Sequence, residues 1–234
     1  MKILSLDTSG LVASSAISED GKIIAEYTLN YKLTHSQTIM PMIDEIVKLS
    51  QTDINTIDYI ACAAGPGSFT GLRIGAATAK GFAHGLKKPI VAVPTLEALA
   101  YNIFGTEKYI CPIMDARRKQ VYNAVYVFDG YELKEVLPPA TRIIDEVLDF
   151  VSKLDKKAVF LGDGIFVYKD AIDKCENAVI APLNCNLQRA ASVAAVAENY
   201  IAKSKFMDGS DFAPEYLRKS QAERELEEKQ KSGE

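Results

Sequence analysis

The feature that constrains the fold most is an order of predicted strands and turns that occurs twice along the chain. Asp20-Gly21 and Asp129-Gly130 each separate two strand-like segments, and Asp-Gly is a strong signal for a tight β-hairpin. In each half of the chain another short apolar strand precedes the hairpin, and segments with helical periodicity follow it. This order, without any residue-level repeat, predicts two successive α/β lobes that each open with three antiparallel strands.

The bounds of the expected elements follow from apolar runs and turn residues. In the first lobe we expect strands at 3–6, 13–18, 22–28, 59–64 and 89–93, and helices at 36–49, 68–86 and 96–104. In the second we expect strands at 109–115, 120–129, 133–137 and 158–161, and helices near 144–154, 166–175 and 187–204. The chain is thus predicted to form an N-terminal lobe at 1–104, a C-terminal lobe at 105–217 and a charged tail at 218–234 that is a frayed helix or disordered.

Composition narrows the classes of function. The formal net charge is −4, so the chain has no strong positive field with which to gather nucleic acid by itself. Its four cysteines include no C-x-x-C pair, which indicates free thiols in a reducing compartment rather than disulfides or a zinc site. Asp7 interrupts the first apolar run too early for a secretory signal, and no apolar run approaches the roughly 20 residues that span a bilayer. We therefore expect a soluble, cytoplasmic protein.

Five segments make the sequence recognisable. They are 6–9 (LDTS), 64–75 (AGPGSFTGLRIG), 93–99 (VPTLEAL), 114–122 (MDARRKQVY) and 214–218 (PEYLR). In this order and at this spacing they closely resemble the TsaB family, the dimerization subunit of the bacterial machinery that makes threonylcarbamoyladenosine in tRNA. The resemblance covers nearly the whole chain up to the tail.

The resemblance implies both a fold and a function. The implied fold is α/β, with two actin/hexokinase-like (RNase-H-like) lobes in tandem, each a mixed sheet flanked by helices. The implied role is that of a non-catalytic subunit required for the threonylcarbamoyl group on adenosine 37 of tRNAs that read codons starting with A. Its implied partners are the catalytic paralogue TsaD, with which it dimerises, and the ATPase TsaE in the assembled complex. Contact with tRNA would come only through that complex, and no cofactor is implied.

Three residues are candidates for a nucleotide site. Asp7 and Asp115 lie near the first strand of each lobe, where proteins of this fold hold a metal–phosphate. Gly67 lies in a loop that enters a helix N-terminus, where an anion can bind. The alternatives are structural turn carboxylates, and a tight turn in which Ser68 is the N-cap. The segment 162–164 (GDG) matches a place where the fold often contacts adenosine, although a plain loop explains it as well.

The sequence shows no histidine-based metal site. The catalytic paralogue carries a histidine pair in the segment that resembles 93–99, and the matching positions here are Thr95 and Leu99, which cannot replace an imidazole. The two histidines, His35 and His84, are far apart in sequence. We therefore expect no metal and no catalytic residue. The alternative class is an independent sugar-kinase-like ATP-dependent enzyme or a glycoprotease-like hydrolase, for which no nucleophile with a base and orienting acid is apparent.

Two predicted helices carry the candidate docking surface for the partner. The 68–86 helix is rich in glycine, and small residues at helical spacing let another helix approach closely. The 36–49 helix is two-sided as well, with Thr38 as its expected N-cap and Pro41 in its first turn. The predicted interface residues are Ile39, Met42, Ile43, Ile46, Gly71, Ile74, Gly75, Thr78 and Phe82.

The orientation of these two helices decides between docking and core packing. A row of Leu72, Ala76, Ala79 and Ala83 is expected to pack on the lobe's own sheet. Gly75 is expected to face outward, so that a long side chain there blocks the partner without unfolding the chain. The alternative is that both faces of each helix belong to the core. An apolar face left without its partner predicts a homodimer when the chain is alone.

Overall fold

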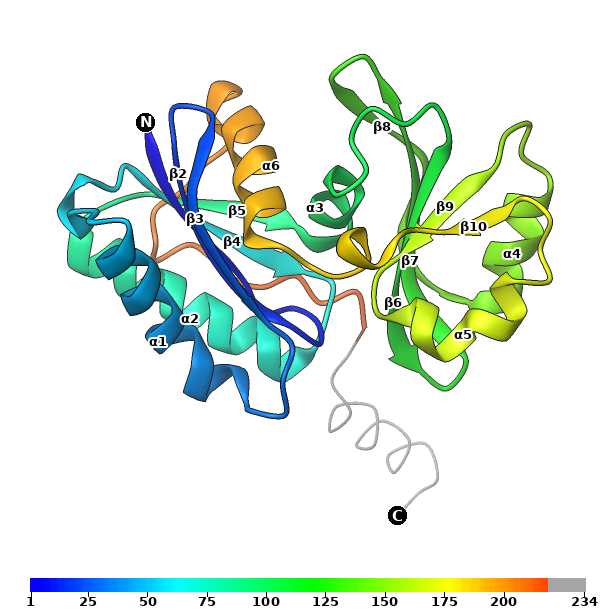
Figure 1. Cartoon of the computed structure of the whole chain (residues 1–234), viewed down its shortest axis with the longest axis horizontal. Helices are drawn as coiled ribbons and strands as arrows, with labels where there is room; N and C mark the ends of the chain where they lie inside the picture. Colours follow the sequence, from blue (N-terminus) through cyan, green and yellow to red (C-terminus); the bar gives the residue numbers. More distant parts are fainter. Residues whose placement is uncertain (219–234) are drawn as a thin grey trace.

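Each half of the chain builds a five-stranded sheet of the same topology, as the repeated hairpin pattern predicts (Figure 1). The computed structural model describes residues 1–218. The first sheet consists of β1 (Lys2–Asp7), β2 (Ala13–Glu19), β3 (Lys22–Leu29), β4 (Tyr59–Gly65) and β5 (Ile90–Pro94), in the order β3-β2-β1-β4-β5. The first three strands are antiparallel, and β4 and β5 run parallel to β1.

The second sheet follows the same plan. It consists of β6 (Tyr109–Arg117), β7 (Gln120–Asp129), β8 (Glu132–Ile143), β9 (Ala158–Leu161) and β10 (Ala178–Ile180), in the order β10-β9-β6-β7-β8. The strand β10 was not expected from the sequence, because three residues are too few to show a periodicity. The other predicted strands are confirmed, and β8 is longer than expected.

Helices cover both faces of the first sheet (Figure 1). They are α1 (His35–Leu49), α2 (Phe69–Leu86), α3 (Thr95–Tyr101), α4 (Ile144–Ser152), α5 (Gly164–Ile172) and α6 (Ala190–Ala202), with 3-10 turns at Ile54–Thr56 and Leu183–Cys185. Helices α1 and α2 lie side by side on one face of the first sheet, and α6 lies on the other. Helices α4 and α5 pack on the second sheet, while α3 contacts strands of both sheets and α6. The two lobes therefore meet through α3.

The first helix begins at His35, one residue before the expected start, but its N-cap lies one turn before the expected one. Its N-cap is Thr34, whose backbone N–H donates to the Gln37 side-chain oxygen at 3.3 Å. The expectation of Thr38 as N-cap is wrong, because its hydroxyl donates to the His35 carbonyl within the helix. Pro41 consequently lies inside α1, where it removes one helical hydrogen bond.

The chain returns to the first lobe after completing the second sheet. Helix α6 packs on β1 and β2, and the first-lobe core includes Val193 and Val196 beside Ile3. The expectation that this helix closes the second lobe is wrong, because order along the chain does not reveal which sheet a helix covers. Phe212 is also buried in the first-lobe core. The division of the chain at residue 104 stays a prediction, and the predicted frayed tail lies, beyond Arg218, outside the described residues.

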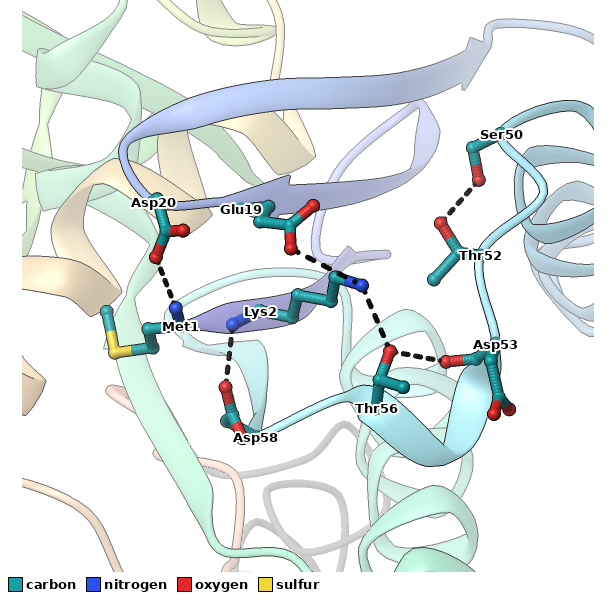
Figure 2. Close-up of polar contacts among 9 residues, drawn as sticks. All are labelled: Met1, Lys2, Glu19, Asp20, Ser50, Thr52, Asp53, Thr56 and Asp58. Atoms are coloured by element: carbon teal, nitrogen blue, oxygen red, sulfur yellow. Dashed lines mark hydrogen bonds and ion pairs between the residues drawn. The ribbon is translucent and has the colours of Figure 1, made fainter.

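Polar contacts join the start of β1 to the two chain segments beside it (Figure 2). The backbone N–H of Lys2 donates to the Asp58 carboxylate at 2.8 Å, and the Lys2 ammonium donates to the Thr56 hydroxyl at 3.2 Å. The amine of Met1 forms an ion pair with Asp20 in the β2–β3 turn. Within residues 1–218, no helix is both long enough and apolar enough to cross a membrane.

Candidate functional site

The turn after β1 holds a buried carboxylate. Asp7 is 1% exposed, and its Oδ1 atom accepts from the Ser9 backbone N–H at 2.8 Å and from the Ser9 hydroxyl at 2.6 Å. Its Oδ2 atom is buried without a hydrogen-bond partner among the described residues. Burial raises the pKa of Asp7 to about 6, against the smaller opposing effects of the Ser9 hydrogen bonds and the His35 charge. Asp7 therefore holds its own turn and is not accessible to a ligand from solvent.

Asp7→Asn is expected to stabilise the protein at neutral pH. The folded-state pKa of about 6 exceeds the ordinary value of 3.8, so the carboxyl contributes stability at low pH that is lost as the pH rises through 6. Asparagine keeps an acceptor for Ser9 without the charge, and the gain above pH 7 should be about 3 kcal/mol. Urea unfolding of both proteins between pH 4 and 8 measures it. A difference that is equal at pH 4 and pH 8 would contradict the assignment.

The loop between β4 and α2 is packed against this same turn. The Ser68 backbone N–H donates to the Ser9 carbonyl at 2.7 Å, and the Ser68 hydroxyl accepts from the Gly71 N–H at 3.3 Å. Ser68 is thus the N-cap, as the structural alternative predicts. A side chain at Gly67 would overlap the Ser9 carbonyl oxygen. Gly67 is therefore required for close packing of the loop, and an anion would have to displace the Ser9 contact.

The corresponding aspartate of the second lobe also has structural partners. The Asp115 carboxylate accepts from the Arg117 backbone N–H at 2.9 Å and from the Tyr168 hydroxyl at 3.3 Å. Its own N–H donates to the Asp163 carboxylate at 3.0 Å. Burial raises the pKa of Asp163 to about 6. The GDG segment is held closely against β6, because a side chain at Gly162 would overlap the Ile113 carbonyl oxygen.

A further buried group, Gln188, was not predicted from any sequence signal. Its side chain is 1% exposed and lies against Gly10, where any β-carbon would overlap the amide. Both amide atoms are buried without hydrogen-bond partners among the described residues. Gln188 precedes α6, so only the return of the chain to the first lobe brings it to the turn after β1.

The positions that match the paralogue's histidine pair are inside the fold. Thr95 and Leu99 lie in α3 and are almost fully buried, and Leu99 packs with Ile110 and Met114 of the second lobe. The Leu99 side chain therefore serves the contact between the lobes, and Thr95 is enclosed in the interior. Among residues 1–218, no group of three or more histidine, cysteine, aspartate or glutamate side chains is arranged to hold a metal ion.

The predicted docking residues divide into two groups. Six of them are buried within the first lobe: Ile39, Met42, Ile43, Ile46, Gly71 and Gly75. The expectation that Gly75 faces outward is wrong, because a β-carbon there would lie 2.5 Å from the Thr8 hydroxyl and 3.4 Å from the Cys62 sulfur. Gly71 likewise faces Thr8, whose hydroxyl donates to the Gly71 carbonyl at 2.8 Å. The row at Leu72, Ala76, Ala79 and Ala83 is buried as predicted.

The outer side of α2 has a different set of small residues. Ala77, Gly81 and Gly85 are exposed and lie one helical turn apart. A β-carbon on Gly81 or Gly85 would meet no atom within 4 Å. The predicted residues Ile74, Thr78 and Phe82 are half-buried at the margins of this strip. We call these six residues the outer α2 face.

The sequence of this chain is similar to proteins of tRNA modification. The family model for TsaD, described as tRNA N6-adenosine threonylcarbamoyltransferase, matches residues 22–226. The TsaB protein of Bacillus subtilis, a tRNA threonylcarbamoyladenosine biosynthesis protein, is 32% identical over 99% of this chain and 100% of its own length. The Escherichia coli TsaB protein is 31% identical, over 97% of this chain and 98% of its own.

A solved structure shares the fold. A Pseudomonas aeruginosa protein described as uncharacterized, with similarity to peptidase YEAZ, superposes with a TM-score of 0.77 at 25% identity, over 93% of this chain and 99% of that one. Two mixed sheets flanked by helices thus define an α/β protein with two actin/hexokinase-like lobes, as expected. It falls within the sequence family that the threonylcarbamoyltransferase model describes. More narrowly, the chain belongs to the TsaB family of tRNA threonylcarbamoyladenosine biosynthesis proteins.

Proposed function

We propose that this chain is a non-catalytic, cytoplasmic subunit required for the threonylcarbamoyl group on adenosine 37 of tRNAs that read codons starting with A. It dimerises with a TsaD-like catalytic paralogue and acts together with a TsaE-like ATPase in the assembled complex. The observation that carries this proposal is similarity to TsaB proteins along 97–99% of the chain. Contact with tRNA takes place in the complex.

The enclosure of Asp7 and the apolar residue at position 99 support the role of a subunit over that of an independent enzyme. A kinase-like or hydrolase-like enzyme needs reactive groups that its substrate can reach. Asp7 is enclosed with Ser9, and Leu99 is an apolar residue in the contact between the lobes. Both residues lie in the interior, which leaves the surface of the chain as the place where it acts.

The outer α2 face is the part of the predicted docking surface that a partner can reach. Small residues at a crossing point let two helices approach closely, and here Ala77 and Gly81 are exposed on successive turns. We therefore centre the proposed interface on Gly81 and not on Gly75.

Gly81→Arg is expected to prevent co-purification with the catalytic paralogue and to abolish the tRNA modification. A long charged side chain at a close helix crossing separates the two helices and should weaken binding by several kcal/mol. The isolated chain should melt within about 2 °C of the parent, because no atom lies within 4 Å of the new β-carbon. Ala202→Arg, at the exposed end of α6, is the matched control and should bind normally.

The same variant tests self-association. We expect the chain alone to form a homodimer through the outer α2 face, since monomers avoid large exposed apolar patches. Light scattering should then report a dimer for the parent and a monomer for Gly81→Arg. A folded Gly81→Arg protein that still binds the paralogue would show that docking uses another surface.

A further inference from the structure

The β6–β7 hairpin has an unusual backbone for its sequence. Arg117, Arg118 and Lys119 are consecutive and all have positive φ angles, of 63°, 56° and 61°. Residues other than glycine, asparagine and aspartate disfavour this left-handed region, because the β-carbon crowds the backbone. A two-residue hairpin turn of this kind is normally built from Asn-Gly or Asp-Gly.

The two other hairpins with two-residue turns among the described residues use glycine in their turns. The β2–β3 turn is Asp20-Gly21, and the β7–β8 turn begins with Gly130, which has a φ of 61°. Among residues 1–218, only the β6–β7 hairpin carries three cationic residues in left-handed positions. The same chain builds two such turns with glycine and therefore with less backbone strain. Strain that is kept in the β6–β7 turn points to a role for its side chains.

The three cations are available to a ligand. All three side chains are exposed, and none forms an ion pair with a carboxylate of the described residues. The nearest carboxylate in sequence, Asp115, is engaged by the Arg117 N–H and by Tyr168. The guanidinium of Arg218 donates to the Ala116 carbonyl at the base of the hairpin. Carboxylates also lie at the base of the hairpin: Asp163 accepts from the Asp115 N–H, and Asp145 and Glu146 follow Ile144, whose N–H donates to the Lys119 carbonyl.

We propose that the β6–β7 hairpin binds the phosphate backbone of tRNA within the complex. The inference rests on the proposed function for the identity of the RNA. An exposed turn makes point contacts with a backbone that passes across it, whereas a free nucleotide needs a concave site that encloses it. With a net charge of −4, the chain alone binds tRNA weakly, and the hairpin adds contacts once the catalytic subunit holds the RNA.

The decisive variant is Arg118→Asn/Lys119→Gly, which removes two charges and installs the preferred turn sequence. Relief of the backbone strain should raise the Tm by a few degrees, so weaker binding cannot come from misfolding. In the purified complex, a tRNA transcript with adenosine 37 should bind at least tenfold more weakly at about 0.1 M salt. The slope of log Kd against log salt concentration should fall by about 1.5, since each phosphate contact contributes about 0.7–0.9.

Two comparisons control for net charge and for side-chain identity. Lys22→Gln/Lys174→Gln removes two exposed charges elsewhere and should leave the slope unchanged. Arg118→Lys/Lys119→Arg keeps both charges and should bind like the parent. Equal tRNA affinity and slope in the parent and the Asn-Gly variant would overturn the inference, as would loss of ATP binding in place of tRNA binding. If the parent chain forms no complex with the catalytic subunit, the proposed function itself fails, and that result appears before any variant is compared.

Discussion

Gly71→Ala is expected to destabilise the fold strongly, whereas Gly81→Ala, on the same helix, is expected to stabilise it. A β-carbon at position 71 would overlap the carbonyl oxygen of Thr8, a backbone atom that cannot turn aside. We expect a loss of about 3 kcal/mol or more, at the upper end of the range for overpacked sites. At position 81 a β-carbon meets nothing within 4 Å, so helix propensity alone acts and favours alanine by up to about 1 kcal/mol.

Urea unfolding of the three proteins, parent included, measures both effects. Gly75→Ala should fall between them, because the Thr8 hydroxyl can rotate away but then loses its hydrogen bond to the Gly71 carbonyl. If Gly71→Ala and Gly81→Ala had the same sign, the helix would be rotated about its axis relative to the orientation described above. The glycines at 71 and 75 would then be free to serve a partner, as the sequence alone suggests.

The buried face of α2 was predictable from the sequence only in part. The periodicity correctly identified a buried row, Leu72, Ala76, Ala79 and Ala83, because apolar side chains record burial. A glycine does not indicate whether its position is buried or exposed, since it suits both a buried close contact and an exposed helix crossing. Gly71 and Gly75 face Thr8, and Gly81 and Gly85 face open space, yet all four are the same residue in one helix. Only the position of Thr8 in three dimensions separates them.

The strands were predictable because local turn residues mark where they end. Both hairpins with Asp-Gly turns, at Asp20-Gly21 and Asp129-Gly130, appear where local signals put them. The two strands of the β6–β7 hairpin were also predicted, although its turn residues, Arg118 and Lys119, are not typical of a turn. The candidate nucleotide residue Asp7 was correctly placed beside a turn, but that turn is covered by Gln188 at Gly10 and by the loop of Ser68 at Ser9, and both are distant in sequence.

The chain after α6 is where sequence order misleads most. Residues 206–216 follow the second lobe along the chain but contact the first. Met207 pairs with Ile90 of β5 through two backbone hydrogen bonds of 2.9 Å, and the Glu215 N–H donates to the Ala64 carbonyl at 2.7 Å. The Tyr216 ring stacks on Phe69 at the start of α2, with centroids 4.3 Å apart. This segment therefore acts as a last layer of the first lobe (Figure 1).

Phe212→Ala is accordingly expected to destabilise the first lobe by about 3–5 kcal/mol, the usual range for a fully buried phenylalanine. Its ring is 1% exposed and belongs to the cluster around Leu4 and Ile60. Phe206→Ala is the matched control from the same segment. Phe206 is 43% exposed and makes an edge contact with Tyr59 at 5.4 Å, so its loss should amount to about 1 kcal/mol.

The location of the damage is as informative as its size, because it tells which lobe the segment belongs to. Hydrogen exchange of the Phe212→Ala protein should show faster exchange at β1 and β4, whose side chains surround the lost ring, before any change at β6 and β7. The Phe206→Ala protein should show little change in either sheet. A loss of protection that begins in the second sheet would mean that the segment stabilises the lobe it follows in sequence. Equal stability of the two variants would mean that Phe212 is not enclosed by the first-lobe core.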